Sequence, residues 1–328
     1  MKILIDSVYV NDGGGKILLD LLIDRIIKDK KDVDFLFDNR YENKLVKSKL
    51  TYFNNFFKRY YFYLNNKYDV IFTFGNLPPL VKGKKNITYF HQPLFVNDNS
   101  SGTTKTKILT YFKKKYIQFY SKNTDIWVVQ TENIKCKLQK TFKLNAVILK
   151  YPFYRELQFE KLDKKHSFLY PSKAYPHKNH EILINGFCDF YDINKNGELI
   201  ITVESENLKI SRLIDAKKKL GYPIKNIGFV NQEKLRREYL KAKFVIFPSE
   251  NESFGLGLIE AVMMKCKLIA PELEYVKDVV KPSITIKSLT IEGITTALIK
   301  ASKENIKDSV LLAKNDLNQI LKLIYGEI

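Results

Sequence analysis

Hydrophobic and polar residues alternate along the chain in a pattern that predicts strands followed by helices. Short apolar runs that end in polar or glycine residues are typical of buried parallel strands. In the first half, such runs lie at Lys2–Val10, Val33–Phe37, Val70–Phe74, Ile87–Phe90 and Ile126–Val129. Apolar residues at helical spacing lie at Lys16–Lys28, after an expected turn at Asn11–Gly15, and from about Thr131 onward. This alternation predicts a parallel sheet covered by helices on both faces.

The same pattern returns after a break near Tyr151–Phe153. Further strands are expected at Ser167–Tyr170, Leu199–Val203, Ile227–Phe229, Phe244–Phe247 and Leu268–Ala270, and helices at His180–Tyr191, Gly257–Met264 and Glu304–Tyr325. A chain of 328 residues is long enough for two domains. We therefore expect an N-terminal domain at 1–155, a second domain at 156–303, and a C-terminal helix at 304–328 that packs back on the first domain.

Positive charge is concentrated in one part of the chain. Residues 51–150 hold 17 Lys and Arg against 4 Asp and Glu, a balance of +13 within a total of +19. Aromatic residues alternate with the basic ones in Phe53–Tyr63 and Lys105–Lys122. Such a mixture suits a lipid interface, so residues 51–122 are expected to bind an anionic membrane surface. One alternative is a helix with an aromatic core face and a solvated basic face. Nucleic acid, which the same residue types also bind, is not expected as a partner.

The remaining composition indicates a cytoplasmic protein. No apolar run reaches the roughly 18 to 20 residues of a membrane-spanning helix, and the first residues lack the pattern of a signal peptide. Cys136, Cys188 and Cys266 are far apart and show no C-x-x-C spacing, so neither a disulfide framework nor a zinc site is expected. The expected location is the cytoplasm, with peripheral attachment to the inner face of the cytoplasmic membrane.

The segment Phe247–Ala261 carries the strongest chemical pattern. An apolar strand ends at Phe247, and a loop with two glycines then leads into a helix. Ligands of open α/β sheets bind at the carboxyl ends of strands, and backbone N–H groups at a helix start attract phosphate. Glu252 on the loop and Glu260 on the helix can face one crevice and hold hydroxyls of a sugar or a ribose. The alternative is a helix start whose acids only favour the helix dipole.

The spacing Glu252-x7-Glu260, within P-S-x-x-E-S-F-G-L-x-x-x-E-A, resembles the signature of retaining glycosyltransferases of family 4, also called group 1. The resemblance implies a GT-B fold, in which two Rossmann-like, doubly wound parallel-sheet domains face a central cleft. It implies that the first domain lies on the acceptor side and that the second binds the nucleotide sugar. By position, Glu260 would bind the ribose and Glu252 the donor sugar. The other donor-binding residues implied in the second domain are Phe254, Gly255, Leu256 and Val230.

A second pattern follows the strand that ends at Tyr170. The family has G-R-x-x-x-x-K here, whose Arg and Lys neutralise the diphosphate, and Lys173 and Lys178 keep the same five-residue step. Lys178 matches directly, whereas Lys173 replaces Arg and Ser172 replaces Gly. A lysine offers a point charge but not the bidentate fork of arginine. Such charge is needed because the leaving diphosphate becomes more negative as the glycosidic bond breaks. The alternative for either lysine is a solvated surface residue.

The first domain contributes glycines and a histidine. Gly13, Gly14 and Gly15 follow the first strand, but they do not form G-x-G-x-x-G. In the family this loop approaches the donor, so Gly14 and Gly15 are candidate donor-binding residues; a structural role is the alternative. His91, at the end of a strand, matches a family position that faces the donor sugar. With Glu252 and Lys178 it completes the candidate catalytic residues, and we expect it to orient the sugar rather than act as a base.

These features predict a metal-independent hexosyltransferase-type enzyme with a nucleoside diphosphate sugar as co-substrate and no cofactor. No metal is expected because the sequence lacks Asp-x-Asp at a strand end. The resemblance implies a lipid-linked glycan acceptor in the assembly of a surface polysaccharide, such as the O-antigen of lipopolysaccharide or capsule. Two alternatives stay open. One is a GT-B-fold sugar-nucleotide epimerase or phosphorylase, and the other is a non-catalytic basic protein that binds membranes or nucleic acid.

Overall fold

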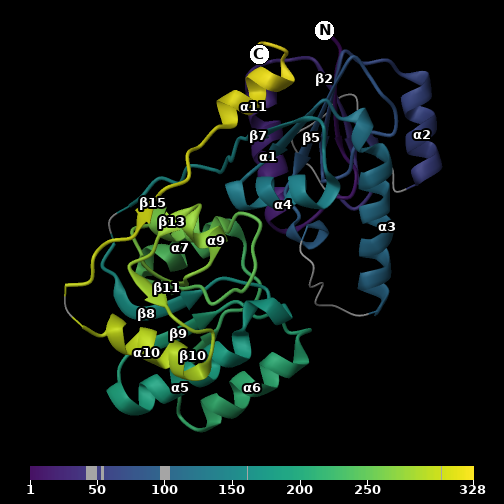
Figure 1. The fold of residues 1–328 in the computed structure, drawn as a ribbon. Helices are drawn as coiled ribbons and strands as arrows, with labels where there is room; N and C mark the ends of the chain where they lie inside the picture. The colour runs from purple at the N-terminus through teal and green to yellow at the C-terminus, as the bar shows by residue number, and fades with distance from the viewer. Residues whose placement is uncertain (42–49, 53–54, 97–103, 161, 304) are drawn as a thin grey trace. The chain divides into compact units, whose positions relative to one another are not determined.

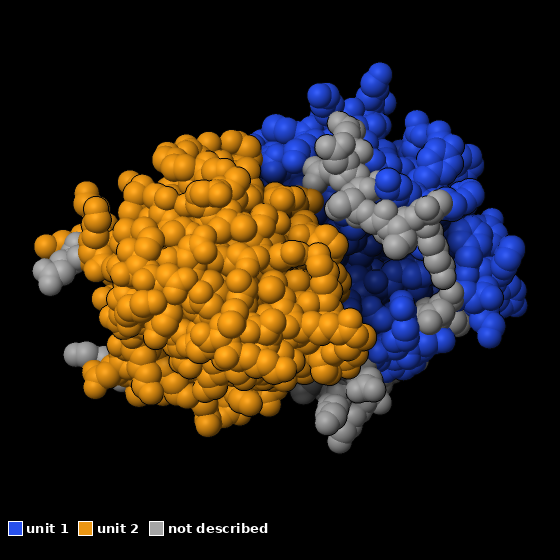
Figure 2. Space-filling model, turned by 90° about the horizontal axis from the view of Figure 1, so that it is seen from below, with its two compact units in different colours: residues 1–155, 314–328 blue, residues 156–313 orange. Residues whose placement is uncertain are grey.

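The structure, a computed structural model, describes residues 1–328 except 42–49, 53–54, 97–103, 161 and 304, and the side chains of 50 and 104–106. Phe53, Asn54 and the side chain of Lys105, which belong to the expected membrane-binding segment, therefore lie outside the described residues. The chain divides into two compact units, shown in different colours in Figure 2. The first comprises residues 1–155 and 314–328, and the second comprises residues 156–313. Each is described here by itself.

The first unit is built on a sheet of seven parallel strands in the order β3-β2-β1-β4-β5-β6-β7 (Figure 1). The strands are β1 (Ile3–Ser7), β2 (Val33–Phe37), β3 (Leu50–Tyr52), β4 (Val70–Phe74), β5 (Lys85–Phe90), β6 (Ile126–Val129) and β7 (Val147–Lys150). The central strand β1 pairs with β2 and β4, so that Ile5 lies opposite Phe35 and Phe72. All five residues of β1 and of β4 are buried, as expected for strands covered on both faces.

Helices connect the strands of this unit. They are α1 (Gly13–Lys28), α2 (Phe56–Asn65), α3 (Thr104–Tyr120), α4 (Glu132–Phe142) and α11 (Leu317–Ile324), with the 3-10 turns η1 (Pro93–Phe95) and η2 (Ser121–Asn123). Side chains cap two of them: Asn55 accepts from the backbone of Phe57, and Thr131 accepts from Ile134. The end of the chain is tied to this unit because Asp316 N donates to Pro152 O (2.7 Å).

The second unit contains six parallel strands in the order β10-β9-β8-β11-β12-β14. The strands are β8 (Lys165–Tyr170), β9 (Glu198–Ile201), β10 (Ile224–Asn226), β11 (Ala242–Ile246), β12 (Lys267–Pro271) and β14 (Ile284–Ile286). The helices are α5 (His180–Asn194), α6 (Leu208–Lys219), α7 (Gln232–Lys241), α8 (Leu256–Met263), α9 (Glu274–Lys277) and α10 (Ile291–Ala301), with the turn η3 (Pro176–Lys178). A separate antiparallel pair joins β13 (Val280–Lys281) to β15 (Val310–Leu311).

The two parallel sheets confirm the predicted α/β, doubly wound class, but three local predictions are wrong. Gly13–Gly15 form the first turn of α1 rather than a turn before it. Glycine costs little there, because the first amides of a helix have no partner within the helix. The strand expected at Ile227–Phe229 ends earlier, at Asn226, because Gly228 adopts φ +64° and the Asn226 side chain accepts from its amide. The terminal helix is only Leu317–Ile324, since Val310–Leu311 pairs with β13.

Candidate functional site

Two loops of the second unit bring Lys178 and Glu252 together. The loop after β8 carries Lys178, and the loop after β11 carries Glu252. Because β8 and β11 are neighbouring parallel strands, their carboxyl ends lie at the same edge of the sheet. Lys178 Nζ forms an ion pair with Glu252 Oε1, and the two side chains are only 13% and 16% exposed. Two residues that are 74 positions apart in sequence thus form one partly desolvated charge pair.

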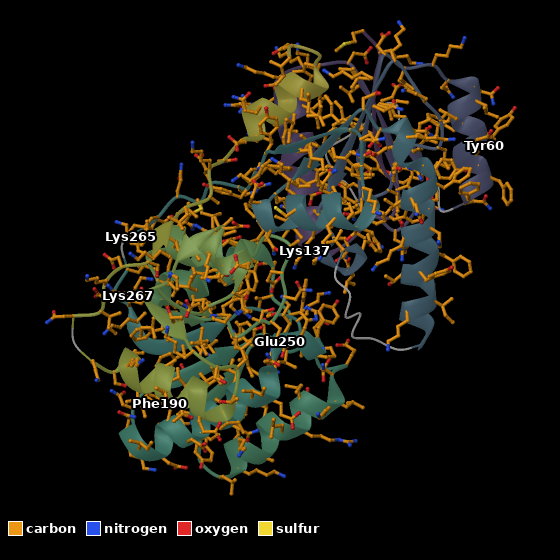
Figure 3. The ribbon with its side chains drawn as sticks, in the orientation of Figure 1. Tyr60, Lys137, Phe190, Glu250, Lys265 and Lys267 are labelled. Atoms are coloured by element: carbon orange, nitrogen blue, oxygen red, sulfur yellow. The ribbon has the colours of Figure 1, made fainter. Side chains whose placement is uncertain are left out.

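Hydrogen bonds hold these two loops against each other and against the sheet. Glu250, which is labelled in Figure 3, lies on the β11 loop and takes part in this network. The bonds are Glu250 N to His177 O (2.9 Å), Asn179 Nδ2 to Pro248 O (3.0 Å), Tyr170 OH to Lys178 O (2.8 Å) and Tyr275 OH to Ser249 O (2.7 Å). The backbone around the ion pair is therefore fixed by bonds that do not use the charged groups themselves, which leaves the charges free to exchange partners.

Gly255 lets the β11 loop turn directly into α8. It adopts φ +73°, a left-handed conformation that glycine reaches without strain. A Cβ at this position would lie 2.9 Å from Leu258 Cδ1, which is closer than real Cβ atoms come. Glycine also offers no side chain to cap the helix, so the amides of Leu256 and Gly257 receive no bond from a capping side chain. Phe254, buried before this turn, anchors the loop in the core.

Glu260 lies in the second turn of α8 and binds a tyrosine rather than a lysine. Tyr239, from α7, donates from its hydroxyl to Glu260 Oε2 (3.0 Å). Burial raises the pKa of Glu260 to about 7, although the hydrogen bond from Tyr239 lowers it. Near neutral pH this carboxyl group is therefore present in both protonation states. Nothing in the local sequence of Tyr239 marks it, because the contact depends on how α7 and α8 pack.

Lys173 does not share the carboxylate of Glu252 but forms an ion pair with another acid, Glu204. Its Nζ lies 3.4 Å from Glu204 Oε1. The loop after β9 that carries Glu204 is tied to the loop after β8, because Asn207 Nδ2 donates to Ala174 O (2.8 Å). Val230 lies in the irregular segment after β10, between Gly228 and α7. The lysines that keep the family's five-residue step thus have separate carboxylate partners.

In the first unit, Gly15 and His91 lie against each other. A Cβ on Gly15 would come within 3.1 Å of His91 Nε2, so glycine permits this close approach. The ring of His91 stacks on Phe74 with centroids 5.2 Å apart. Burial lowers the pKa of His91 to about 4, so the imidazole is neutral at pH 7. Its Nδ1 is buried and has no hydrogen-bond partner within the part of the chain that the structure covers. The imidazole of His91 thus carries no charge at pH 7, and Gly14 lies next to Gly15 in the first turn of α1.

Two other kinds of site are absent from the part of the chain that the structure describes. Outside the undescribed gaps, no three His, Cys, Asp or Glu side chains come together as metal ligands would. Of the helices formed by the described residues, none is both long and apolar enough to cross a bilayer.

Comparison with known proteins gives the family. Residues 155–317, which include the whole second unit, match the family model described as glycosyl transferases group 1. An uncharacterized glycosyltransferase of Methanocaldococcus jannaschii is 22% identical over 100% of this chain and 92% of its own length.

Two solved structures share the fold. Sucrose-phosphate synthase from Thermosynechococcus elongatus aligns with a TM-score of 0.71 and 16% identity, over 92% of this chain and 89% of that one. WaaG, a glycosyltransferase involved in lipopolysaccharide biosynthesis, aligns with a TM-score of 0.69 and 12% identity, over 99% of this chain and 100% of the other. The match of residues 155–317 identifies the chain as a group 1 glycosyltransferase, which transfers a sugar from a nucleotide sugar, and its two parallel sheets and the two structural likenesses show the GT-B fold.

Proposed function

We propose that the protein is a retaining, metal-independent hexosyltransferase that acts on a lipid-linked glycan during surface polysaccharide assembly, such as that of O-antigen or capsule. The Lys178–Glu252 pair at the carboxyl ends of β8 and β11 carries the donor part of this proposal. The likeness to WaaG, whose own role is in lipopolysaccharide biosynthesis, supports the acceptor class.

The donor is held by an exchange of partners at the ion pair. In the protein without ligand, Lys178 neutralises Glu252. A nucleoside diphosphate sugar offers Lys178 a phosphate instead, and the freed carboxylate of Glu252 accepts hydrogen bonds from sugar hydroxyls. Lys178 gains an anionic partner and Glu252 gains hydrogen bonds from hydroxyls, so neither group is left without a polar partner. Lys173, paired with Glu204 at 3.4 Å, is a second phosphate ligand at the edge of the same loop.

The remaining donor contacts are made by Glu260 and by residues at the starts of helices. The carboxylate of Glu260 accepts hydrogen bonds from the ribose hydroxyls, and Tyr239 holds this carboxylate in place. The amides around Phe254, Gly255 and Leu256 bind the phosphate or the sugar, and Gly14 and Gly15 allow the donor to approach α1. Val230 lines the donor site from the segment after β10.

The chemical step requires charge stabilisation more than proton transfer. As the glycosidic bond breaks, negative charge grows on the diphosphate, where Lys178 and the start of α8 stabilise it. His91 is neutral at pH 7 and orients the donor sugar by hydrogen bonding. Retention follows if the acceptor attacks the face from which the diphosphate departs, which is why no covalent nucleophile is assigned.

The acceptor side is proposed to work on a membrane. The balance of +13 in residues 51–150 attracts an anionic lipid surface, where a lipid-linked glycan would be found. We place the protein in the cytoplasm, peripherally on the inner face of the cytoplasmic membrane, with no nucleic-acid partner.

The test is product analysis. The purified protein is incubated with labelled nucleotide sugars and bacterial membranes in the presence of a chelator, and the lipid-extractable glycan is analysed by NMR. We expect label in the glycan with the anomeric configuration of the donor, and no label with the Glu252→Ala variant. Epimerised or phosphorolysed sugar alone would instead indicate the epimerase or phosphorylase alternative. No labelled product with the wild type would leave the binding protein, and full transfer by Glu252→Ala and Glu260→Ala would contradict the assignment of the donor site. Complete loss of transfer in the chelator would contradict metal independence.

A further inference from the structure

Helix α2 buries an arginine and leaves several large apolar side chains exposed. Its buried residues are Arg59, only 2% exposed, and Tyr63, which belongs to the hydrophobic core. Phe57 and Tyr61 are 77% and 70% exposed, and Leu64 is exposed as well. Tyr60, labelled in Figure 3, belongs to the same exposed aromatic set. A surface helix normally turns its apolar side chains to the core, so these exposed residues indicate that the surroundings of α2 in its working state are partly apolar.

A buried polar lock fixes this orientation. Arg59 Nε and Nη2 donate to Asp6 Oδ2 at 2.8 and 2.5 Å, and Tyr63 OH donates to the same oxygen at 2.5 Å. The other oxygen of Asp6, on the central strand β1, accepts from Val8 N at 3.1 Å. Burial alone would lower the pKa of Arg59, but the attraction of Asp6 outweighs it, so the guanidinium stays charged. We name Asp6, Arg59 and Tyr63 the α2 lock.

Helix α3 lies beside α2 in Figure 1. The two helices are in contact, because the ring centroids of Phe56 on α2 and Tyr116 on α3 are 6.5 Å apart. On α2, an open hollow of about 440 Å³ is lined by Phe57, Lys58, Tyr61, Phe62, Asn65 and Asn66. Large apolar side chains of α3 are exposed as well: Ile108, Leu109, Tyr111, Phe112 and Phe119. We call these residues of α2 and α3 the aromatic face.

Cations accompany the aromatic face, and acids do not. Lys115 Nζ lies 5.8 Å from the ring of Tyr111, and Lys122 Nζ, just beyond α3, lies 5.3 Å from the ring of Phe119. Neither α2 nor α3 contains an Asp or a Glu in its sequence. A surface with exposed rings and lysines, formed by helices that contain no acidic residue, matches the headgroup region of an anionic bilayer in both polarity and charge.

We propose that the aromatic face inserts into the surface of an anionic lipid bilayer, and that the α2 lock holds α2 in the orientation that presents it. The aliphatic residues favour lipid over nucleic acid, because Leu64, Ile108 and Leu109 gain from contact with acyl chains but offer no ring for base stacking. This inference rests on the membrane part of the proposed function and makes no use of the donor site. The two can therefore fail separately.

The aromatic face is tested with lipid vesicles of phosphatidylcholine mixed with phosphatidylglycerol, and with phosphatidylcholine alone. The wild-type protein is expected to float with the mixed vesicles and to be released by high salt. The Phe57→Ser/Tyr61→Ser variant should bind them about tenfold more weakly or worse, because two exposed rings no longer enter the interface. The matched control is Ile193→Ser/Leu220→Ser, which removes two similarly exposed apolar side chains of the second unit and should bind like the wild type. Unchanged binding by the aromatic variant, or tight binding to RNA with none to vesicles, would overturn the proposal.

The lock is tested by removing both of its charges in Asp6→Asn/Arg59→Met, so that neither stays buried alone. Hydrogen exchange of Phe56–Asn65 should speed up and vesicle affinity should fall about tenfold, while nucleotide binding by the second unit stays unchanged. Tyr63→Phe removes one hydrogen bond without removing charge and should shift both readouts less, in the same direction. If both variants bind vesicles with wild-type affinity, the α2 lock contributes only to packing in the core, and its proposed role in orienting α2 for membrane binding is overturned. A protein that docks on vesicles but transfers no sugar would contradict the proposed function alone.

Discussion

Lys178 and Lys173, in the loop after β8 of the second unit, each have a carboxylate partner from a neighbouring loop, whereas neither α2 nor α3 of the first unit contains an acidic residue of its own. Lys178 pairs with Glu252 and Lys173 with Glu204. In residues 51–150, by contrast, the sequence contains 17 Lys and Arg but only 4 Asp and Glu. Lysines and carboxylates that already neutralise one another can exchange partners with a small ligand that has both phosphates and hydroxyls. Lysines beside exposed rings, on helices without acidic residues, are suited to an extended anionic surface instead. The two units thus differ in the size of the partner for which their charges are arranged.

The largest effect is expected from breaking the partly buried ion pair of Lys178 and Glu252. Lys178→Ala or Glu252→Ala should lower kcat/KM for sugar transfer about 1,000-fold, or about 4 kcal/mol, because a charge that stabilises the transition state is lost and its partner is left unpaired. The control is the exposed Lys209–Glu181 ion pair of the same unit, changed as Lys209→Met and Glu181→Gln. Exposed pairs contribute little, so less than about a twofold change is expected. Equal losses in both pairs would remove the distinction on which the comparison rests.

Removing the charge of Glu260 is expected to act on donor binding. Glu260→Gln should raise the KM for the nucleotide sugar about 10- to 100-fold, since a carboxylate accepts from two ribose hydroxyls better than an amide does. Because the pKa of Glu260 is about 7, the wild-type KM should fall as the pH rises through 7 and the carboxylate forms. The variant should show no such fall. A wild-type KM that is constant from pH 6 to about 8 would contradict the assignment of Glu260 to the donor.

The same residue makes a prediction about stability. Burial raises the pKa of Glu260 from 4.5 to about 7, so the folded protein holds this proton where the unfolded chain has lost it. The protonated carboxyl group therefore contributes most below pH 4.5, and its contribution is lost as the pH rises through 7, by up to about 3 kcal/mol. Urea unfolding should show this loss in the wild type and not in Glu260→Gln, which is expected to be the more stable protein at pH 8. The opposite order at pH 8 would show that the carboxylate is stabilised by its surroundings.

A smaller effect is expected from the tyrosine that positions Glu260. Tyr239→Phe should raise the donor KM about fivefold, the cost of one hydrogen bond of about 1 kcal/mol. It should also move the pH dependence of KM to higher pH, because the bond from Tyr239 lowers the pKa of Glu260. Tyr222→Phe is the control, since Tyr222 OH also donates to a carboxylate, that of Asp192, but on the surface (2.7 Å). If the pH dependence of the donor KM is the same in Tyr239→Phe as in the wild type, Tyr239 does not influence the titration of Glu260 and has only a packing role.

The smallest effect is expected at Lys173. Lys173→Ala should raise the donor KM only about threefold, because this lysine is more than a third exposed and its charge is screened by water. Lys173→Arg restores the residue type of the family and should bind the donor at least as well as the wild type, through a bidentate fork. Steady-state kinetics of the two variants would decide this. A loss at Lys173 as large as that at Lys178 would mean that both lysines hold the diphosphate equally.

The sequence predicted most of the framework because buried parallel strands are recognisable locally. Val33–Phe37, Val70–Phe74 and Ile126–Val129 are strands at the predicted bounds, since each is an apolar run ended by polar residues. The strand near Ile227 was misplaced because its end depends on the bonds of the Asn226 side chain and the backbone of Gly228. The first turn of α1 was predicted as a loop, because three consecutive glycines have a low helix propensity.

The candidate site was partly predictable for a similar reason. Glu252, Glu260 and Lys178 follow strand ends, and the carboxyl ends of neighbouring strands meet at one edge of a sheet. Their partners depend on packing between distant segments and leave no local signal. Tyr239 reaches Glu260 from another helix, and Asp6 meets Arg59 across 53 positions. In the sequence Arg59 stands in a basic, aromatic run and resembles a solvated residue, although it is buried.

The central claim is that the second unit binds a nucleoside diphosphate through Lys178, Glu252 and Glu260. Calorimetric titration with a panel of nucleoside diphosphates tests it most directly, using the wild type, Lys178→Ala, Glu260→Gln and the surface control Lys209→Met/Glu181→Gln. One nucleotide should bind the wild type and the control equally, and should bind each site variant at least about tenfold more weakly. Equal affinity in the site variants, or no binding of any nucleotide to the wild type, would contradict it.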